Sequence, residues 1–206
     1  MVVGREARPA PGAGPQPALF AAAAASMNAA RLRPEVESEP MPAPQRIAPY
    51  ATALSADVVV DDEDLGTGRL ILLHDPDGNP AWGGEFRFVA YARAEIDPGL
   101  VTDPLLGEVG WSWLTDALSA HGAQYTAASG TVTRVAVENF GAMADEERSA
   151  QLEVRASWTP DVPDSGDVRA HVEAWGELLC TSVGLEPVPD GVTAMSSRRP
   201  AHGSAS

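Results

Sequence analysis

Residues 85–96, EFRFVAYARAEI, decide the fold because apolar and polar side chains alternate along the whole stretch. Successive side chains of a β-strand point to opposite faces of a sheet, so this pattern predicts a strand with two different faces. One face carries two glutamates and two arginines and must meet water or a polar partner. The pattern therefore predicts an antiparallel sheet that is covered on one side only.

Other patterned segments surround this strand. Helical spacing of apolar residues predicts three helices, at about residues 20–30, 103–120 and 167–181. Alternation predicts four further strands, at residues 50–60, 69–74, 124–140 and 151–158. The order α-β-β-β-α-β-β-α predicts an α+β fold, a two-layer α/β sandwich in which helices cover one face of a five-stranded antiparallel sheet.

Proline and glycine mark the limits of the folded region. Residues 1–17 and 196–206 are expected to be disordered tails, and residues 18–195 to form a single α+β domain. Residues 39–44, EPMPAP, predict an extended, polyproline-like connector between the first helix and the sheet. Residues 75–80, DPDGNP, predict a turn.

The charge of the chain restricts its partners. The formal net charge is −15; residues 1–33 carry +3 and residues 198–199 carry +2, so −20 falls on residues 34–197. An acidic body repels phosphate backbones and argues against nucleic-acid binding by the domain. Arginines at the two ends leave regulatory nucleic-acid binding open as an alternative.

The location of the protein is predicted from two features. No apolar run is long enough to span a bilayer, so no membrane partner is expected. The single cysteine, Cys180, permits no intramolecular disulfide, which favours a reducing compartment and a cytoplasmic protein.

Motifs for catalysis, cofactors or metals are weak throughout, and we predict no catalytic, cofactor-binding or metal-ligating residue and no cofactor. His171 and Glu173 have the spacing of zinc deaminases, but the P-C-x-x-C partner motif is missing. His171 flanks an apolar helical stripe and is interpreted as a structural histidine. Cys180 is interpreted as a small core residue near a helix C-terminus.

An interaction surface is the more promising kind of site. Trp82 follows the predicted turn at residues 75–80, and Trp111 lies at the edge of a helical stripe. Tryptophan is enriched at interface hot spots, although partial burial in the monomer core explains both residues slightly better. The predicted interaction surface consists of Trp82, Arg87, Tyr91, Arg93 and Trp111.

Several motifs together resemble one family. They are residues 33–36 (RPEV), 42–46 (PAPQR), 67–76 (TGRLILLHDP), 103–114 (DPLLGEVGWSWL), 125–134 (YTAASGTVTR), 155–160 (RASWTP) and 173–180 (EAWGELLC). The chain from about Phe20 to Val192 resembles the actinobacterial domain-of-unknown-function family numbered three thousand. The resemblance implies no activity and no functional residue. In element order alone, the chain is similar to the type III secretion chaperone-like fold, which raises the expectation of a binding protein.

Two classes of function follow. The first is a non-enzymatic, cytoplasmic protein-binding or adaptor module, chaperone-like and homodimeric, that contacts itself or another protein through its exposed sheet face or tryptophan edge. The alternative is an enzyme or small-ligand binder with a site assembled from distant residues, such as His74, Asp75, Arg134 and Arg155. Convergence of those four residues in one cleft favours the alternative, and their scatter argues against it.

Overall fold

The computed structural model describes residues 16–186. The predicted tails therefore lie outside the described residues, apart from positions 16 and 17, as do residues 187–195 of the predicted domain. The elements in chain order are α1 (Ala18–Asn28), β1 (Val36–Met41), β2 (Tyr50–Val60), β3 (Glu63–Asn79), β4 (Gly84–Ile96), η1 (Pro98–Thr102), α2 (Leu106–Ala120), β5 (Tyr125–Val137), η2 (Gly141–Met143), β6 (Ser149–Pro160) and α3 (Arg169–Ser182). Within residues 16–186, no helix has the length and apolar character needed to cross a membrane.

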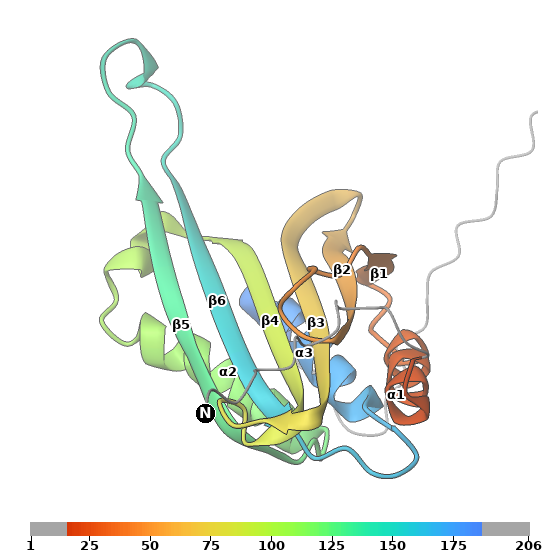
Figure 1. The fold of residues 1–206 in the computed structure, drawn as a ribbon. Coiled ribbons are helices and arrows are strands. Elements are labelled where there is room, and N and C mark those ends of the chain that lie inside the picture. Colours follow the sequence, from red (N-terminus) through yellow and green to blue (C-terminus); the bar gives the residue numbers. More distant parts are fainter. Residues whose placement is uncertain (1–15, 187–206) are drawn as a thin grey trace, which may run out of the picture.

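All strands form one antiparallel sheet, in the order β1-β2-β3-β4-β6-β5 (Figure 1). The α+β class and the antiparallel sheet are confirmed, but the prediction of five strands is wrong, because the sheet has six. The missed strand is β1, which lies within and just before the predicted polyproline-like connector. Pro40 is compatible with this strand because β1 is at the edge of the sheet and pairs only with β2.

Strand β3 is much longer than the predicted strand at residues 69–74, and it includes residues 75–79 of the predicted turn, whereas the turn itself lies at residues 80–83. The turn before β3 is tight, with Asp61 and Asp62 at φ values of 52° and 67°. Gly68, predicted to lie in the turn, is in the strand and faces α3. A Cβ atom at Gly68 would lie 2.6 Å from Cδ2 of Leu179, so the absence of a side chain lets the helix approach the strand.

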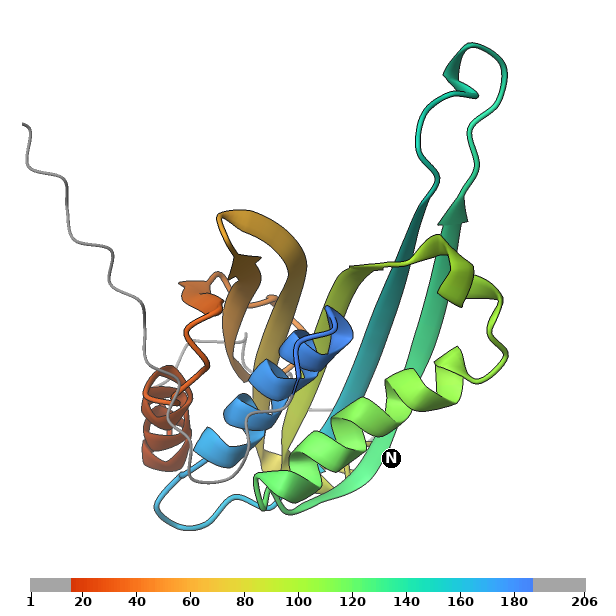
Figure 2. The same ribbon diagram turned by 180° about the vertical axis from the view of Figure 1, so that it is seen from behind.

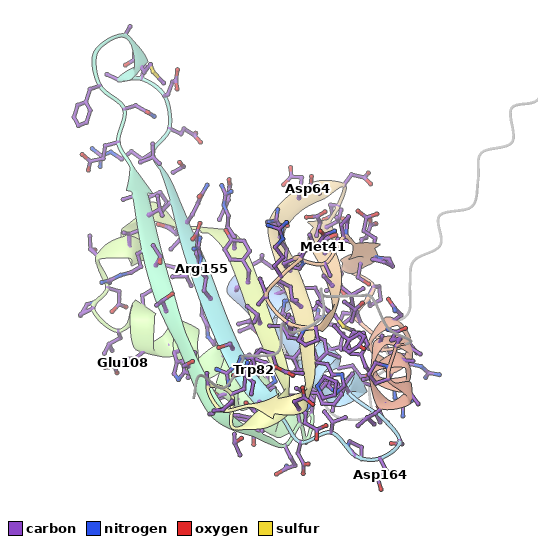
Figure 3. The ribbon with its side chains drawn as sticks, in the orientation of Figure 1. Met41, Asp64, Trp82, Glu108, Arg155 and Asp164 are labelled. Carbon is purple, nitrogen blue, oxygen red and sulfur yellow. The ribbon has the colours of Figure 1, made fainter. Side chains whose placement is uncertain are left out.

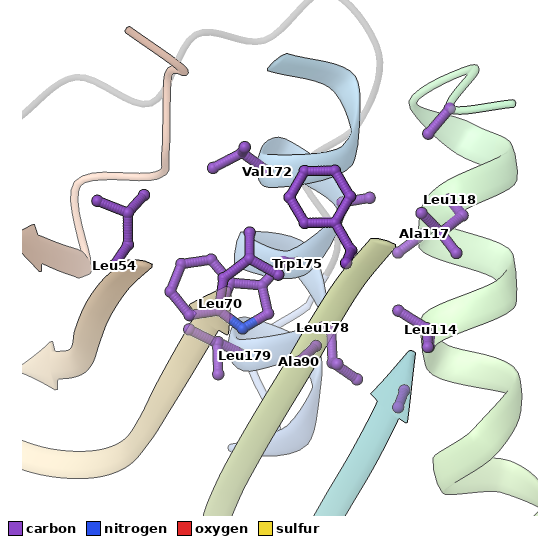
Figure 4. Packing of buried hydrophobic residues seen from close by; sticks show 14 of the residues in the cluster. Leu54, Leu70, Ala90, Leu114, Ala117, Leu118, Val172, Trp175, Leu178 and Leu179 are labelled. Carbon is purple, nitrogen blue, oxygen red and sulfur yellow. The ribbon is translucent and has the colours of Figure 1, made fainter. Parts of the chain in front are cut away.

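Helices α2 and α3 lie across one face of the sheet, α1 lies beside the β1 edge next to α3, and the other face is open, as expected from residues 85–96 (Figures 1 and 2). The core fills the space between the two layers (Figure 4). Trp175 of α3 is fully buried there, with Leu70 of β3 and Leu178 beside it. The indole Nε1 of Trp175 donates a hydrogen bond to the backbone oxygen of Tyr91, 3.5 Å away. Helix α3 is thus the central element of the covered layer.

Candidate functional site

The open face of the sheet gathers polar side chains because every second residue of its central strands points away from the helices. In the register of the sheet, Arg69 of β3 is opposite Tyr91 of β4, and Tyr91 is opposite Arg155 of β6. Figure 3 shows Arg155 on the side away from α2 and α3. Three residues that are distant in sequence therefore form one row across the sheet.

A hollow of about 910 Å³ lies over this row. We call it the open-face hollow. It combines arginines, one tyrosine, hydroxyl side chains and a small apolar floor. Its lining side chains on the open face are Thr67, Arg69, Ile71, Val89, Tyr91, Arg93, Ser129, Thr131, Arg155 and Ser157.

On one side of the hollow, the carboxylate of Glu153 fixes the positions of two neighbouring side chains, Tyr91 and Arg155. Glu153 accepts a hydrogen bond from the Tyr91 hydroxyl at 3.1 Å and an ion-paired hydrogen bond from Arg155, also at 3.1 Å. The Arg155 guanidinium lies 5.4 Å from the centre of the Tyr91 ring, within the range of a cation–π contact. Burial and the bond to Glu153 raise the pKa of Tyr91. Tyr91 is thus held as a neutral, oriented ring at the centre of the hollow.

The other two arginines of the hollow differ in their neighbours: Arg93 is opposite Glu153 in the register of the sheet, whereas Arg69 is opposite Ser55 and Tyr91. Arg69 and Arg93 are exposed, and within residues 16–186 neither guanidinium forms a hydrogen bond or an ion pair. A guanidinium carries five N–H donors in a rigid fork that matches a carboxylate or a phosphate. These two side chains are therefore available to an anionic group that enters the hollow.

A buried arginine lies at one end of the hollow. The side chain of Arg87 is only 8 % exposed, and no carboxylate among the described residues pairs with it. Burial lowers the pKa of Arg87. The guanidinium donates to neutral oxygens only: Ala127 O (2.8 Å), Thr159 Oγ1 (3.0 Å), Ser129 Oγ (3.3 Å) and Ser157 Oγ (2.7 Å).

The contacts of Arg87 shape the neighbouring strand and the hollow. Ala127 has a φ of 50°, and the pairing of β5 with β6 shifts between Thr126 and Ser129, which is a β-bulge. Ser129 and Ser157 accept from Arg87 and are 3.4 Å apart, so one of them can donate to the other. At least one hydroxyl hydrogen is then left for a ligand in the hollow.

The structure places the residues of the predicted interaction surface in different positions. Tyr91 and Arg93 line the hollow, and Arg87 is buried at its end. Trp82 is half-buried in the turn before β4, where its backbone oxygen accepts a 2.6 Å hydrogen bond from Thr159. Trp111 is on the other face, against the core. The predicted surface is thus brought together in part, and its role in binding stays a prediction.

The four residues of the alternative site do not converge. His74 is buried on the helix side and stacks on Phe86, with ring centres 4.2 Å apart; burial lowers its pKa. Its neighbour Asp75 is also buried. Arg134 donates to the backbone oxygen of Asp103 at 2.7 Å, which ties β5 to the segment after η1, and only Arg155 is in the hollow. This scatter argues against a catalytic site built from these residues.

Buried polar groups of the covered layer have structural roles. His171 is 3 % exposed, and its Nδ1 accepts a 3.2 Å hydrogen bond from the indole of Trp158. Burial lowers the pKa of His171 to about 4, so the side chain is neutral at pH 7. Burial raises the pKa of the Cys180 thiol to about 11. In the part of the chain that the structure describes, no group of three His, Cys, Asp or Glu side chains could hold a metal ion.

Sequence reasoning missed Arg69 and the hydroxyls of Ser129, Thr131 and Ser157 as site residues. Alternation along each strand shows which residues share a face. It does not show that β6 lies between β4 and β5, which is what brings Arg155 beside Tyr91. A useful signal was present in residues 85–96, whose polar face already contains Arg87, Tyr91 and Arg93.

The fold and the hollow define a class of protein: a small α+β protein with a helix-covered sheet whose open face is lined by arginines. The chain belongs to the protein family of unknown function DUF3000, whose model matches residues 16–193. No curated protein and no solved structure matches the chain. The similarity to the type III secretion chaperone-like fold is inferred from the predicted element order, which does not include β1. This similarity stays a prediction.

Proposed function

We propose that this protein is a non-enzymatic binding module that takes up an acidic segment of a protein on the open face of its sheet. The observation that carries the proposal is the open-face hollow, where Arg69 and Arg93 flank Tyr91 and, among the described residues, form no ion pair. A cytoplasmic location is part of the proposal, because the single cysteine is a buried thiol in the covered layer.

The negative charge of the rest of the molecule supports binding of an acidic partner at the open-face hollow rather than elsewhere on the surface. Residues 34–197 carry a formal charge of −20. Like charges repel an acidic partner from most of this surface, whereas the arginines of the hollow, of which Arg69 and Arg93 form no ion pair within residues 16–186, attract it. The acidic body thus directs such a partner to one face.

The chemistry of the hollow supports a peptide with carboxylates and an apolar or aromatic residue. Guanidinium groups bind carboxylates through paired N–H donors. Ile71, Val89 and the Tyr91 ring provide apolar contact area between the arginines. Tyrosine and arginine are also the residue types that dominate many interfaces.

Fluorescence anisotropy with a labelled, glutamate-rich peptide that contains one phenylalanine tests this proposal. The same peptide with glutamine at every glutamate position is the matched ligand control. The variant Arg69→Ser/Arg93→Ser removes the two free guanidinium groups. Arg31→Ser is the matched protein control, since Arg31 is exposed and lies just after α1, away from the hollow.

We expect the acidic peptide to bind the wild type and the Arg31→Ser variant equally, and the double variant roughly tenfold more weakly. Binding should also weaken at high salt, because exposed charges are screened. Equal affinity for the acidic and glutamine peptides, or an unchanged affinity in the double variant, would reject the proposal.

A competition experiment separates a peptide from a small anion as the ligand. The volume of the hollow is within the range of small-molecule sites, roughly 300–1,000 Å³. Inorganic phosphate and citrate are therefore added to the peptide complex at constant ionic strength. Weak competition at millimolar concentrations supports the peptide, whereas micromolar displacement would assign the hollow to a small anionic ligand.

A further inference from the structure

The hairpin between β5 and β6 extends beyond the rest of the molecule. Residues 137–149 continue these two strands into a projection that leaves the sheet at one end (Figures 1 and 2). We call these residues the arm. The arm carries three exposed large apolar side chains: Phe140 is 77 % exposed, Met143 is 50 % exposed and Val137 is 41 % exposed. Exposed apolar side chains that gather on a projection are typical of an interaction site.

The arm is also acidic. It contains Glu138, Asp145, Glu146 and Glu147 against the single cation Arg148, which gives a formal charge of −3. An aromatic residue among carboxylates is the composition that the open-face hollow is suited to bind. The two surfaces of this chain are therefore complementary in charge and in apolar content.

The arm cannot reach the hollow of its own chain. Its base is fixed by the pairing of Val137 with Ser149, and β5 and β6 are paired from there toward the hollow. The arm projects away from the sheet in both views (Figures 1 and 2). Contact between these complementary surfaces thus requires two molecules.

We infer that the acidic segment bound by the open-face hollow is the arm of a second copy of this chain, in a reciprocal, two-fold symmetric dimer. This inference rests on the proposed function. In such a dimer each copy contributes one arm and one hollow, so two identical contacts form and the assembly closes. The carboxylates of each arm pair with Arg69 and Arg93 of the other copy, and Phe140 packs on the apolar floor beside Tyr91.

The dimensions of the chain are compatible with this exchange. Arg155 in the hollow is six residues from Ser149 at the base of the arm, both in β6. A strand rises about 3.3 Å per residue, so this separation is about 20 Å. Two copies that overlap at the arm ends of their sheets by roughly this length bring each arm over the hollow of the other.

Charge reversal tests the inference through complementation. The arm variant is Asp145→Arg/Glu146→Arg/Glu147→Arg, and the face variant is Arg69→Glu/Arg93→Glu. All of these side chains are exposed, so both variants should fold, and circular dichroism checks this. Sedimentation equilibrium measures the mass of each protein, with Arg31→Glu as the control for a distant charge reversal.

We expect the wild type and the Arg31→Glu variant to be dimers, and each reversed variant alone to dissociate about a hundredfold more readily, because like charges then oppose each other. An equimolar mixture of the two reversed variants should form a heterodimer, since both of its contacts again pair opposite charges. A monomeric wild type, or a mixture that stays monomeric, would overturn the inference.

The two proposals can fail separately. If the wild type is monomeric but the Arg69→Ser/Arg93→Ser variant binds the acidic peptide more weakly, the hollow binds acidic segments and its partner is another protein. If the peptide binds all variants equally, the proposed function fails regardless of the oligomeric state.

Discussion

The covered face and the open face of the sheet come from the same strands and differ in almost every property. On β4, Phe88 and Ala90 point to the helices and are buried, whereas Tyr91 and Arg93 point to the hollow. Neighbouring residues of one strand thus pack in the core on one side and line the hollow on the other. Substitutions on the covered face should change the free energy of unfolding, and those on the open face should change binding.

The strongest test of the covered face is Trp175→Ala. This side chain is fully buried between α3 and the sheet, and its removal leaves a large cavity. We expect a loss of about 3–5 kcal/mol in the free energy of unfolding, measured by urea denaturation. A loss below about 1 kcal/mol would show that α3 is not central to the core.

The pH dependence of the free energy of unfolding tests the covered face, because His171 is buried there in its neutral form. Its pKa is about 4 in the folded protein, below its ordinary value of 6.5, so the unfolded chain binds the proton first as the pH falls. Stability should be highest above pH 6.5 and should decrease by about 3 kcal/mol as the pH approaches 4.

Urea denaturation at a series of pH values between those limits measures this loss. The lowered pKa of His74 acts in the same direction and in the same pH range, whereas the lowered pKa of Asp167 reduces stability only when the pH falls below its ordinary value of 3.8. The control is His171→Asn, which keeps an acceptor for the Trp158 indole and should flatten most of the profile. An unchanged profile in that variant would exclude His171 as the main cause.

A smaller effect is expected where α3 meets β3. In Gly68→Ala the new methyl group would lie 2.6 Å from Cδ2 of Leu179 and 2.9 Å from Cζ2 of Trp175, so these side chains must move. The expected loss is about 1–3 kcal/mol in the free energy of unfolding. Gly107→Ala is the matched control, because a Cβ there meets no atom within 4 Å. Equal stability of the two variants would contradict this close approach.

The smallest effect on stability is expected on the open face. Arg69→Ser/Arg93→Ser removes exposed side chains that form no ion pair among the described residues. We expect the free energy of unfolding to change by less than about 0.5 kcal/mol, while the peptide binds roughly tenfold more weakly. A large loss of stability would mean that these arginines serve the fold and would remove the contrast between the faces.

Much of the fold could be predicted because residues 85–96 alternate so regularly. Their alternation correctly indicated a sheet with one open face, and helical spacing located the three helices. Strand β1 could not be found this way, because Pro40 and its neighbouring prolines favour polyproline-like backbone, and only the pairing with β2 makes the segment a strand.

The candidate site could be predicted only in part. The polar face of β4 supplied Tyr91 and Arg93, but the hollow also needs Arg69 and Arg155 from β3 and β6. Their alignment depends on strand order and register, which are set by contacts between distant segments. Trp111 is predicted to belong to the interaction surface because it is a tryptophan at the edge of a helical stripe. In the structure it packs against the core on the covered face.

The most direct test of binding on the open face is a map of amide chemical shifts when the acidic peptide is added to isotope-labelled protein. The largest changes are expected at Arg69, Tyr91, Arg93 and Arg155 and in the bulge near Ser129, with α3 unaffected. Changes centred on the helices, or no changes at peptide concentrations that saturate the anisotropy signal, would contradict binding in the open-face hollow.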